Sequence, residues 1–254
     1  MAAPKMFDLS ETVAIVTGGN GGIGRGIALG LAEAGAAVAI LARNQEKNRA
    51  VVAELEALGV RAIALEADLS DRTQLKPALD RVERDLGAVN ILVNNAGIAV
   101  MSPTLTLEPA QWDSVIETNL TSCFILSRLA AQSMVARKAG KIINVASEYA
   151  FFGAPVLPSY SAAKGGLMQL TKSMAIELAR HNIQVNAIVP GWIETAMTEP
   201  VKSGPLYAEI LMRTPAGRFG RPEECAGAAV FLASHASDFV TGSAVFVDGG
   251  YRIR

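Results

Sequence analysis

The stretch Thr17-Gly18-Gly19-Asn20-Gly21-Gly22-Ile23-Gly24 decides the fold. It follows an apolar, β-prone run at 12–17 and opens a helical pattern over 23–34. Glycines let the backbone turn sharply and approach a pyrophosphate without Cβ atoms in the way. The helix N-terminus then offers unpaired N–H groups and a partial positive charge. A glycine-rich turn can be purely structural, but its place between a strand and a helix favours dinucleotide binding.

The rest of the chain alternates between strand-like and helix-like segments. Further strands are expected at 37–41, 60–66, 90–93, 141–146, 183–189 and 243–247. Further helices are expected at 45–58, 71–86, 111–137 and 159–180. The strand segments are largely apolar on both faces, as parallel strands covered by helices are. This rhythm predicts one α/β domain over 1–254, a doubly wound parallel sheet (Rossmann fold) of about seven strands with helices on both faces.

Composition excludes several classes of protein. Apolar residues make up 50% of the 254 residues, and 23 basic against 24 acidic residues leave a net charge of −1, so no nucleic-acid partner is expected. The start, Met-Ala-Ala-Pro-Lys-Met-Phe-Asp, has no apolar secretory stretch, and no run of ~18 apolar residues predicts a membrane span. The two cysteines, Cys123 and Cys225, and the two histidines, His181 and His235, suit no metal site. A cytoplasmic enzyme without a metal, acting on a small molecule, is expected.

The end of the second strand indicates which dinucleotide binds. Enzymes that use NAD typically place an acidic residue about 20 positions after the turn, where it binds the ribose 2′-hydroxyl. Here Ala42 stands at that place and Arg43 follows it. An arginine can pair with a 2′-phosphate, whereas a carboxylate would repel it. NADP(H) is therefore the expected cofactor, with NAD(H) as the alternative if Arg43 is only a solvated surface residue.

Tyr160 and Lys164 are the main candidates for chemistry. Their four-residue spacing places them on one face of a helix, one turn apart. A tyrosine in water ionises near pH ~10, so base catalysis at neutral pH needs a neighbouring positive charge. Ser147 ends a strand thirteen residues before Tyr160, and Asn119 stands inside a helical pattern, where asparagine is unfavourable unless its side chain has a role.

With these residues in place, the sequence resembles the single-domain short-chain dehydrogenases/reductases over essentially its whole length. The matching motifs are the 17–24 turn, Asp68-Leu69, Asn94-Asn95-Ala96-Gly97, Asn119, Ser147, the Tyr160/Lys164 pair, Pro190-Gly191 and Val247-Asp248-Gly249-Gly250. The resemblance implies an oxidoreductase that interconverts a secondary alcohol and a ketone. The cofactor would provide the hydride, and the protein would supply geometry and proton transfer.

The resemblance also implies the catalytic roles. Tyr160 would exchange a proton with the substrate oxygen, and Ser147 would hydrogen-bond that oxygen. Lys164 would bind the nicotinamide ribose and favour ionisation of Tyr160, while Asn119 would hold a water that links Lys164 to solvent.

The implied cofactor contacts come from the turn, from three strand ends and from the loop after 191. They are Gly18, Asn20, Gly22, Ile23, Gly24, Arg43, Asp68, Leu69, Asn95, Ala96, Gly97, Tyr160, Lys164, Pro190, Gly191, Ile193 and Thr195. Asp68 would reach the adenine, and Ile193 and Thr195 would fix the carboxamide. Beside Ser147, the residues expected to line the substrate pocket are Tyr149, Phe152 and Trp192.

The substrate is less sharply indicated. The stretches 183–193 and 236–242 resemble gluconate 5-dehydrogenases and 2-deoxygluconate 3-dehydrogenases, whereas 193–198 and 214–218 resemble 3-oxoacyl-carrier-protein reductases. The reductases carry arginines on two long helices for an acidic carrier protein, and Gln132 and Ile176 stand at those positions here. A gluconate-type sugar acid is therefore preferred. Its carboxylate would want a cation, and Lys202 and Arg213 are the candidates on the irregular stretch 192–221, a possible substrate lid.

Other functional classes remain open. The fold could serve a non-catalytic NADP(H)-binding sensor, because fold alone does not fix function. A sugar-nucleotide epimerase also uses a tyrosine–lysine pair, but it would need a larger C-terminal substrate domain. The small residues of the two long helices and the last strand suggest symmetric interfaces, so a homotetramer is expected.

Overall fold

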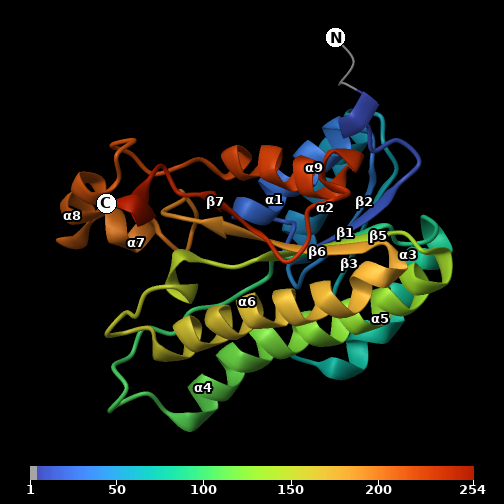
Figure 1. Ribbon diagram of the computed structural model, residues 1–254. Coiled ribbons are helices and arrows are strands. Elements are labelled where there is room, and N and C mark those ends of the chain that lie inside the picture. The colour runs from blue at the N-terminus through green and yellow to red at the C-terminus, as the bar shows by residue number, and fades with distance from the viewer. Residues whose placement is uncertain (1–4) are drawn as a thin grey trace.

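The computed structural model describes residues 5–254 and contains one seven-stranded sheet (Figure 1). Its strands are β1 (Val13–Thr17), β2 (Ala37–Leu41), β3 (Ala62–Leu65), β4 (Ile91–Asn94), β5 (Gly140–Val145), β6 (Ile183–Pro190) and β7 (Ala244–Val247). They are all parallel and lie in the order β3-β2-β1-β4-β5-β6-β7. The predicted doubly wound sheet is confirmed. The N-terminal stretch was expected to contain no secretory segment. Its first four residues, 1–4, lie outside the described residues.

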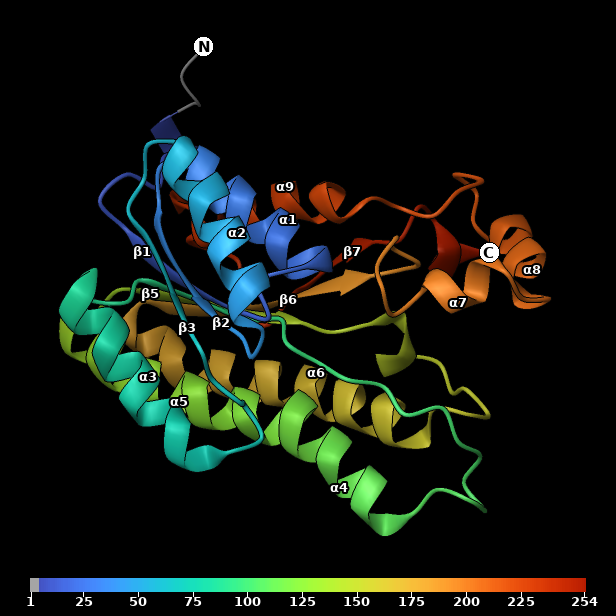
Figure 2. The same ribbon diagram turned by 180° about the vertical axis from the view of Figure 1, so that it is seen from behind.

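Helices cover both faces of the sheet (Figures 1 and 2). One face carries α1 (Gly22–Glu33), α2 (Gln45–Ala57) and α9 (Ala226–Ala233). The other carries α3 (Arg72–Asp85), α5 (Ser122–Arg137) and α6 (Pro158–Leu178), with α4 (Pro109–Ile116) extending the line of α5. Two short helices, α7 (Glu199–Lys202) and α8 (Leu206–Arg213), stand beyond the carboxyl ends of the strands.

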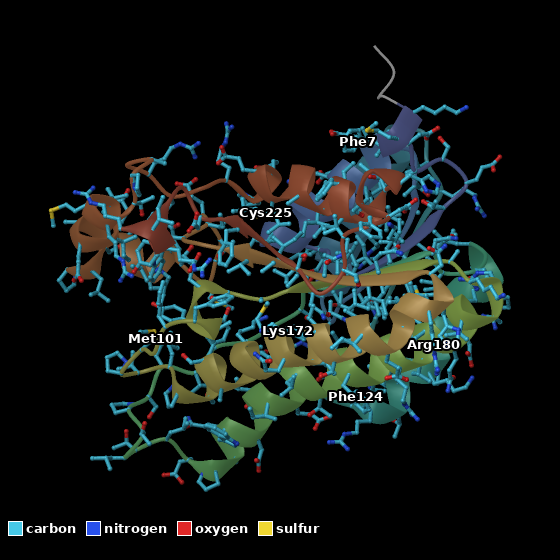
Figure 3. The ribbon with its side chains drawn as sticks, viewed as in Figure 1. Phe7, Met101, Phe124, Lys172, Arg180 and Cys225 are labelled. Atoms are coloured by element: carbon cyan, nitrogen blue, oxygen red, sulfur yellow. The ribbon has the colours of Figure 1, made fainter. Side chains whose placement is uncertain are left out.

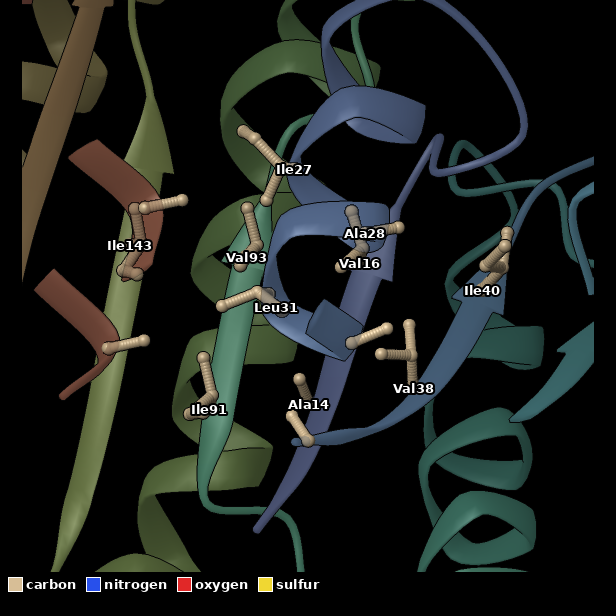
Figure 4. Close-up of a cluster of buried hydrophobic side chains, with 14 of the residues drawn as sticks. Ala14, Val16, Ile27, Ala28, Leu31, Val38, Ile40, Ile91, Val93 and Ile143 are labelled. Carbon is tan, nitrogen blue, oxygen red and sulfur yellow. The ribbon is translucent and has the colours of Figure 1, made fainter. Parts of the chain in front are cut away.

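The core is divided by the sheet into two apolar layers. Val16 and Val93 point toward Ile27 and Leu31 of α1, as Figure 4 shows. Ile15, the neighbour of Val16 on β1, instead joins the layer under α3, α5 and α6. Successive strand residues face opposite sides, so strands buried on both sides must be apolar throughout. This burial explains why β1 and β2 lack the polar alternation of half-exposed strands.

The helical stretch expected over 111–137 is confirmed, but it is not a regular α-helix throughout. The helical segment begins at Pro109, behind a capping box at Glu108, and is interrupted by a π-helical turn at Glu117–Thr121. Asn119 lies in that π turn, and its side chain forms two hydrogen bonds with the backbone of Ile98. Its Nδ2 donates to the Ile98 carbonyl at 2.8 Å, and its Oδ1 accepts from the Ile98 N–H at 2.9 Å. Such π turns occur frequently at functional sites.

The segment 192–221 is also more ordered in structure than expected. Rather than one long irregular loop, it contains α7 and α8. Helix α9 was not predicted, because its sequence Ala-Gly-Ala-Ala-Val-Phe-Leu-Ala is apolar all round and gives no amphipathic period. Among residues 5–254 no helix is long and apolar enough to cross a membrane, and no group of three or more His, Cys, Asp or Glu could hold a metal ion.

A buried pair of carboxyl groups joins the turn after β5 to the turn after β7. Glu148 is 4% exposed, and neither of its side-chain oxygens has a hydrogen-bond donor. Burial, and then the neighbouring Asp248, raise the pKa of Glu148 to about 7. Burial acts against ionisation of Asp248 too, but the backbone N–H groups of Arg252 and Gly250 outweigh it and lower the pKa of that carboxyl. A protonated Glu148 can thus donate a hydrogen bond to an ionised Asp248, and the pair then carries one negative charge.

This pair makes stability depend on pH. Between pH ~4.5 and about 7 the folded protein keeps a proton on Glu148 that the unfolded chain releases, so the free energy of unfolding falls as pH rises through that window. The loss is at most about 3 kcal/mol, from ~1.4 kcal/mol per pKa unit. Urea unfolding at pH 5 and pH 8, at one protein concentration, measures it. Glu148→Gln should give a flatter pH profile; equal profiles for both proteins would contradict this assignment.

Candidate active site

The ends of the central strands β1 and β4 are tied together by Thr17. Its Oγ1 accepts hydrogen bonds from the backbone N–H groups of Asn95 (2.9 Å) and Ala96 (3.0 Å). The Asn95 Nδ2 donates to the Thr17 carbonyl at 2.8 Å. The strand order reverses between these two strands, with β2 and β3 beside β1 and β5 to β7 beside β4. This switch point is where open parallel sheets form a ligand crevice.

The glycine turn at this crevice restricts side chains at three of its glycines. Gly18 has φ +63°, and a Cβ on Gly24 would lie 2.3 Å from the Gly18 carbonyl oxygen. A Cβ on Gly22, where φ is +49°, would meet Cγ2 of Thr195 at 3.1 Å. Gly21 caps α1 without a side-chain bond, so the first N–H groups of the helix remain available to an anion. The turn therefore fits a pyrophosphate, and it lies next to Thr195, the residue expected at the carboxamide.

Three other residues of the expected cofactor set are engaged elsewhere. The Asn20 amide donates to Oδ1 of Asn48 on α2 at 2.8 Å, so it braces the turn. Ile23 packs against the core layer under α1, and Leu69 is 5% exposed in the opposite layer. The side chains of Ile23 and Leu69 thus support the crevice by packing in the core. Only their backbone groups can contact a ligand.

Arg43 and Asp68 lie together at the outer end of the crevice. The guanidinium of Arg43 is 69% exposed, and its Nη1 is 4.0 Å from Oδ2 of Asp68. Hydrogen bonds from Ser70 hold the pKa of Asp68 below its usual range. An exposed ion pair of this kind contributes at most about 1 kcal/mol, so it leaves the Arg43 side chain available to a phosphate.

The opposite wall begins where β6 ends at Pro190. A Cβ on Gly191 would lie 2.8 Å from Cα of Asp248, so the chain passes here in backbone contact with the turn after β7. Ile193 is 3% exposed and forms a parallel bridge with Gly220. A cavity of about 220 Å³ lies between this bridge and the β7 turn. The backbone after β6 is thereby fixed opposite the glycine turn.

Tyr160 and Lys164 occupy one face of α6, as their spacing predicts. The Lys164 Nζ lies 5.7 Å from the centroid of the Tyr160 ring. The lysine is 3% exposed, and its ammonium donates to the Val145 carbonyl at 2.7 Å. Val145 is the last residue of β5, two positions before Ser147. The strand end that carries Ser147 therefore also fixes the ammonium beside the tyrosine.

Asn119 and Lys164 face a common space beside Gly97. A Cβ on Gly97 would lie 3.4 Å from Oδ1 of Asn119 and 3.6 Å from Nζ of Lys164. At these distances a Cβ would be in ordinary van der Waals contact with both side chains and would occupy part of this space. The structure thus brings together the end of β4, the π turn and the lysine of α6.

Ser147 and Tyr149, both expected to line the substrate pocket, lie together beside Tyr160. The Ser147 Oγ accepts a hydrogen bond from the Tyr149 N–H at 3.2 Å, which leaves its own hydrogen free to donate. The Tyr149 ring stands edge-on to Tyr160 and to Trp192, with centroids 6.3 Å apart in both pairs. Burial, and then the neighbouring Tyr251, raise the pKa of Tyr149 to about 12, so it stays protonated at neutral pH.

Phe152, expected in the substrate pocket, contacts residues of α8 and of the turn after β7. Its ring packs against Tyr251, with centroids 6.3 Å apart, and against the guanidinium of Arg213, at 5.0 Å. Tyr251 was not among the predicted site residues. Its position follows the Val247-Asp248-Gly249-Gly250 motif directly, which is the one sequence signal that could have identified it.

A buried polar chain behind the site was also missed. The Asn94 amide donates to Ser127 Oγ and to Asn144 Oδ1, both at 2.8 Å, and the Asn144 amide donates to Thr171 Oγ1 at 2.8 Å. Asn94 and Asn144 are direct partners on β4 and β5. Two neighbouring apolar strands that each carry an asparagine near the end were the available signal. Because Ser127 lies on α5 and Thr171 on α6, these hydrogen bonds fix both helices against the sheet.

Comparisons with known proteins agree with this geometry. The family model described as Enoyl-(Acyl carrier protein) reductase matches residues 18–252. The chain is 41% identical to a 2-dehydro-3-deoxy-D-gluconate 5-dehydrogenase of Formosa agariphila, over 96% of this chain and 94% of that protein. It is also 41% identical to the 5-keto-D-gluconate 5-reductase of Escherichia coli, over 96% and 97% of the two chains.

Solved structures give the same result. A gluconate 5-dehydrogenase from Burkholderia cenocepacia, in complex with NADP and tartrate, superposes with a TM-score of 0.93 and is 40% identical over 98% of each chain. The expected family is thus confirmed: the chain belongs to the short-chain dehydrogenases/reductases, NAD(P)-dependent oxidoreductases that act on CH–OH groups.

Proposed function

We propose that this chain, as a single domain, transfers a hydride between NADP(H) and a secondary alcohol or ketone of a gluconate-type sugar acid. The observation that carries the proposal is the arrangement of Tyr160, Lys164 and Ser147 beside a glycine crevice that fits a dinucleotide. The named activities of the relatives support a sugar-acid substrate, and the NADP bound to the Burkholderia cenocepacia protein supports the cofactor. NAD(H) is the alternative cofactor.

In the reductive direction the residues would act on the carbonyl oxygen. The nicotinamide, when bound, supplies the hydride to the carbonyl carbon. Ser147 donates a hydrogen bond to the oxygen, and Tyr160 gives it a proton. The Lys164 ammonium stabilises the resulting phenolate, and a proton returns to Tyr160 from solvent through the water that Asn119 would hold and Lys164. Backbone at Ile193 and the side chain of Thr195 orient the carboxamide.

The main competing substrate is an acyl chain carried by an acidic protein. Such a partner needs basic docking residues near the mouth of the site. Gln132 on α5 and Ile176 on α6 are both exposed, and neither carries a charge. A small sugar acid therefore remains the better substrate for this surface.

Replacing the proposed acid tests the reaction. Tyr160→Phe keeps the ring but removes the proton, so kcat should fall roughly 10²- to 10⁴-fold, the usual contribution of acid–base catalysis. Steady-state kinetics with 5-keto-D-gluconate and NADPH measure the loss, and fluorescence titration should show a far smaller change in the Kd for NADPH, because the Tyr160 hydroxyl is only one of many expected cofactor contacts. Tyr207→Phe, in a ring that packs on Phe219, should retain full turnover. Normal turnover by Tyr160→Phe would indicate a non-catalytic or differently catalysed function.

Cofactor choice tests Arg43. One charge-assisted hydrogen bond contributes ~1.5–3 kcal/mol, so Arg43→Ala should weaken NADPH binding roughly 10- to 150-fold and leave NADH binding unchanged. Fluorescence titrations of both nucleotides measure the two Kd values. Arg49→Ala, also exposed and on α2, serves as the control. If the unaltered protein binds NADH as tightly as NADPH, Arg43 is a surface residue.

A homotetramer is proposed from the exposed apolar side chains. Phe124 on α5 is 46% exposed and Ile176 on α6 is 81% exposed (Figure 3 labels Phe124). Phe239 and Ile253, before and after β7, are 104% and 86% exposed and suit a second interface. Both surfaces would be buried by closed two-fold symmetry.

Light scattering tests the assembly. The protein should have the mass of four chains, and Phe124→Asp together with Ile176→Asp should reduce it, because charge would be buried at the interface of α5 and α6. Lys47→Asp, on α2 across the sheet from α5 and α6 (Figure 1), reverses a charge at an exposed site as the control. A single sharp monomer peak for the unaltered protein would contradict the tetramer.

A further inference from the structure

Two cations on the segment 192–221 differ sharply in their surroundings. Lys202 is neutralised, because its Nζ lies 3.2 Å from carboxylate oxygens of both Glu194 and Glu199. Arg213 forms no ion pair with any residue of the described range 5–254, and its buried Nε has no hydrogen-bond partner there. A buried N–H donor without a hydrogen-bond partner lowers stability. A ligand that supplies an acceptor atom to Arg213 would remove this cost.

Arg213 is held by two aromatic rings. It is the last residue of α8, and its guanidinium carbon lies 4.3 Å from the Tyr251 ring centroid and 5.0 Å from that of Phe152. Just past the helix, the Ala216 N–H donates to the Gly249 carbonyl at 3.0 Å, which docks this end of α8 on the turn after β7. Rings that contact the face of a guanidinium leave its N–H edge to bind a carboxylate.

The position of Arg213 connects it with the reacting groups. Phe152 belongs to the turn that follows Ser147. The Arg213 charge is also close enough to Tyr149 to oppose the rise in its pKa, which burial and the tyrosines 251 and 160 produce. Tyr149 in turn contacts Tyr160 edge-on. Arg213 thus lies on the Tyr149 side of the catalytic tyrosine, farther out in the pocket.

The local charge favours an anion. Arg213 and Arg252 are the cations that act on the Glu148–Asp248 pair. The guanidinium of Arg252 is covered by the rings of Phe246, at 4.1 Å, and Phe151. With one proton shared by the two carboxyl groups, two positive charges face one negative charge. This part of the pocket therefore carries a net positive charge below about pH 7, where Glu148 keeps its proton.

We propose that Arg213 binds the carboxylate of the substrate and so selects sugar acids over neutral sugars. The carboxylate would accept hydrogen bonds from the guanidinium edge while the distant hydroxyl or keto carbon lies at Ser147 and Tyr160. Arg213 is then a specificity-determining residue. This assignment rests on the proposed function, because it presupposes a substrate with a carboxylate.

A pair of probes that differ only at the carboxylate tests the assignment. These are 5-keto-D-gluconate and L-sorbose, in which a hydroxymethyl group replaces the carboxylate. Arg213→Gln should raise KM for the keto acid roughly 10- to 150-fold, the value of one charge-assisted hydrogen bond, with kcat nearly unchanged. Its kcat/KM for L-sorbose should stay the same. Arg213→Lys should recover part of the loss, and Lys202→Gln, which removes a cation that is already paired, should leave both substrates unaffected.

The outcomes separate the two proposals. An equal loss on both probes, accompanied by a lower Tm or weaker NADPH binding, would mean that Arg213 is structural and would overturn the assignment. Preserved preference for the keto acid in Arg213→Gln would overturn it as well, while the proposed function stands. If the unaltered protein shows no preference for the keto acid over L-sorbose, the sugar-acid function itself fails, and the assignment fails with it.

Discussion

The connection that Thr17 makes between β1 and β4 is the constraint on which the rest of the site depends. At this switch point the connections that follow β1 and β4 lead to opposite faces of the sheet, and one hydroxyl group ties the two strand ends together by accepting two N–H donors from the end of β4. Gly18 and Gly24 can then approach each other without side chains. The crevice is therefore a consequence of strand order, and the glycines are the residues that this geometry tolerates.

The groups proposed for chemistry reach the crevice from helices, yet strand ends and loops hold them. Lys164 is anchored by the carbonyl of Val145, and Asn119 is anchored by the backbone of Ile98. Each anchor lies near a strand of the central sheet, whose core is packed on both faces. These anchors restrict the movement of the Lys164 and Asn119 side chains. Proton transfer requires donor and acceptor atoms at fixed positions, and the anchored side chains meet that requirement.

The sequence predicted the sheet and its helical layers, and it singled out the Tyr160/Lys164 pair as a candidate, because each has a local signal: apolar runs, a glycine turn, or a four-residue spacing. The π turn at Asn119 has no such signal, since one inserted residue leaves the helical pattern continuous over 111–137. The pairing of Glu148 with Asp248 joins residues one hundred positions apart, which periodicity cannot detect. Likewise, only the fold could distinguish the neutralised Lys202 from Arg213.

This division also explains why the reaction class was easier to predict than the substrate. The groups proposed for the reaction lie on α6, in the π turn and just after β5, where packing fixes them to the sheet. The outer wall comes from α8 and the turn after β7, which meet through contacts such as Ala216 with Gly249 and Arg213 with Tyr251. Residues there can change without disturbing the core, so substrate choice can vary while the chemistry stays the same. Specificity in this protein must therefore be sought where the C-terminal turn meets α8.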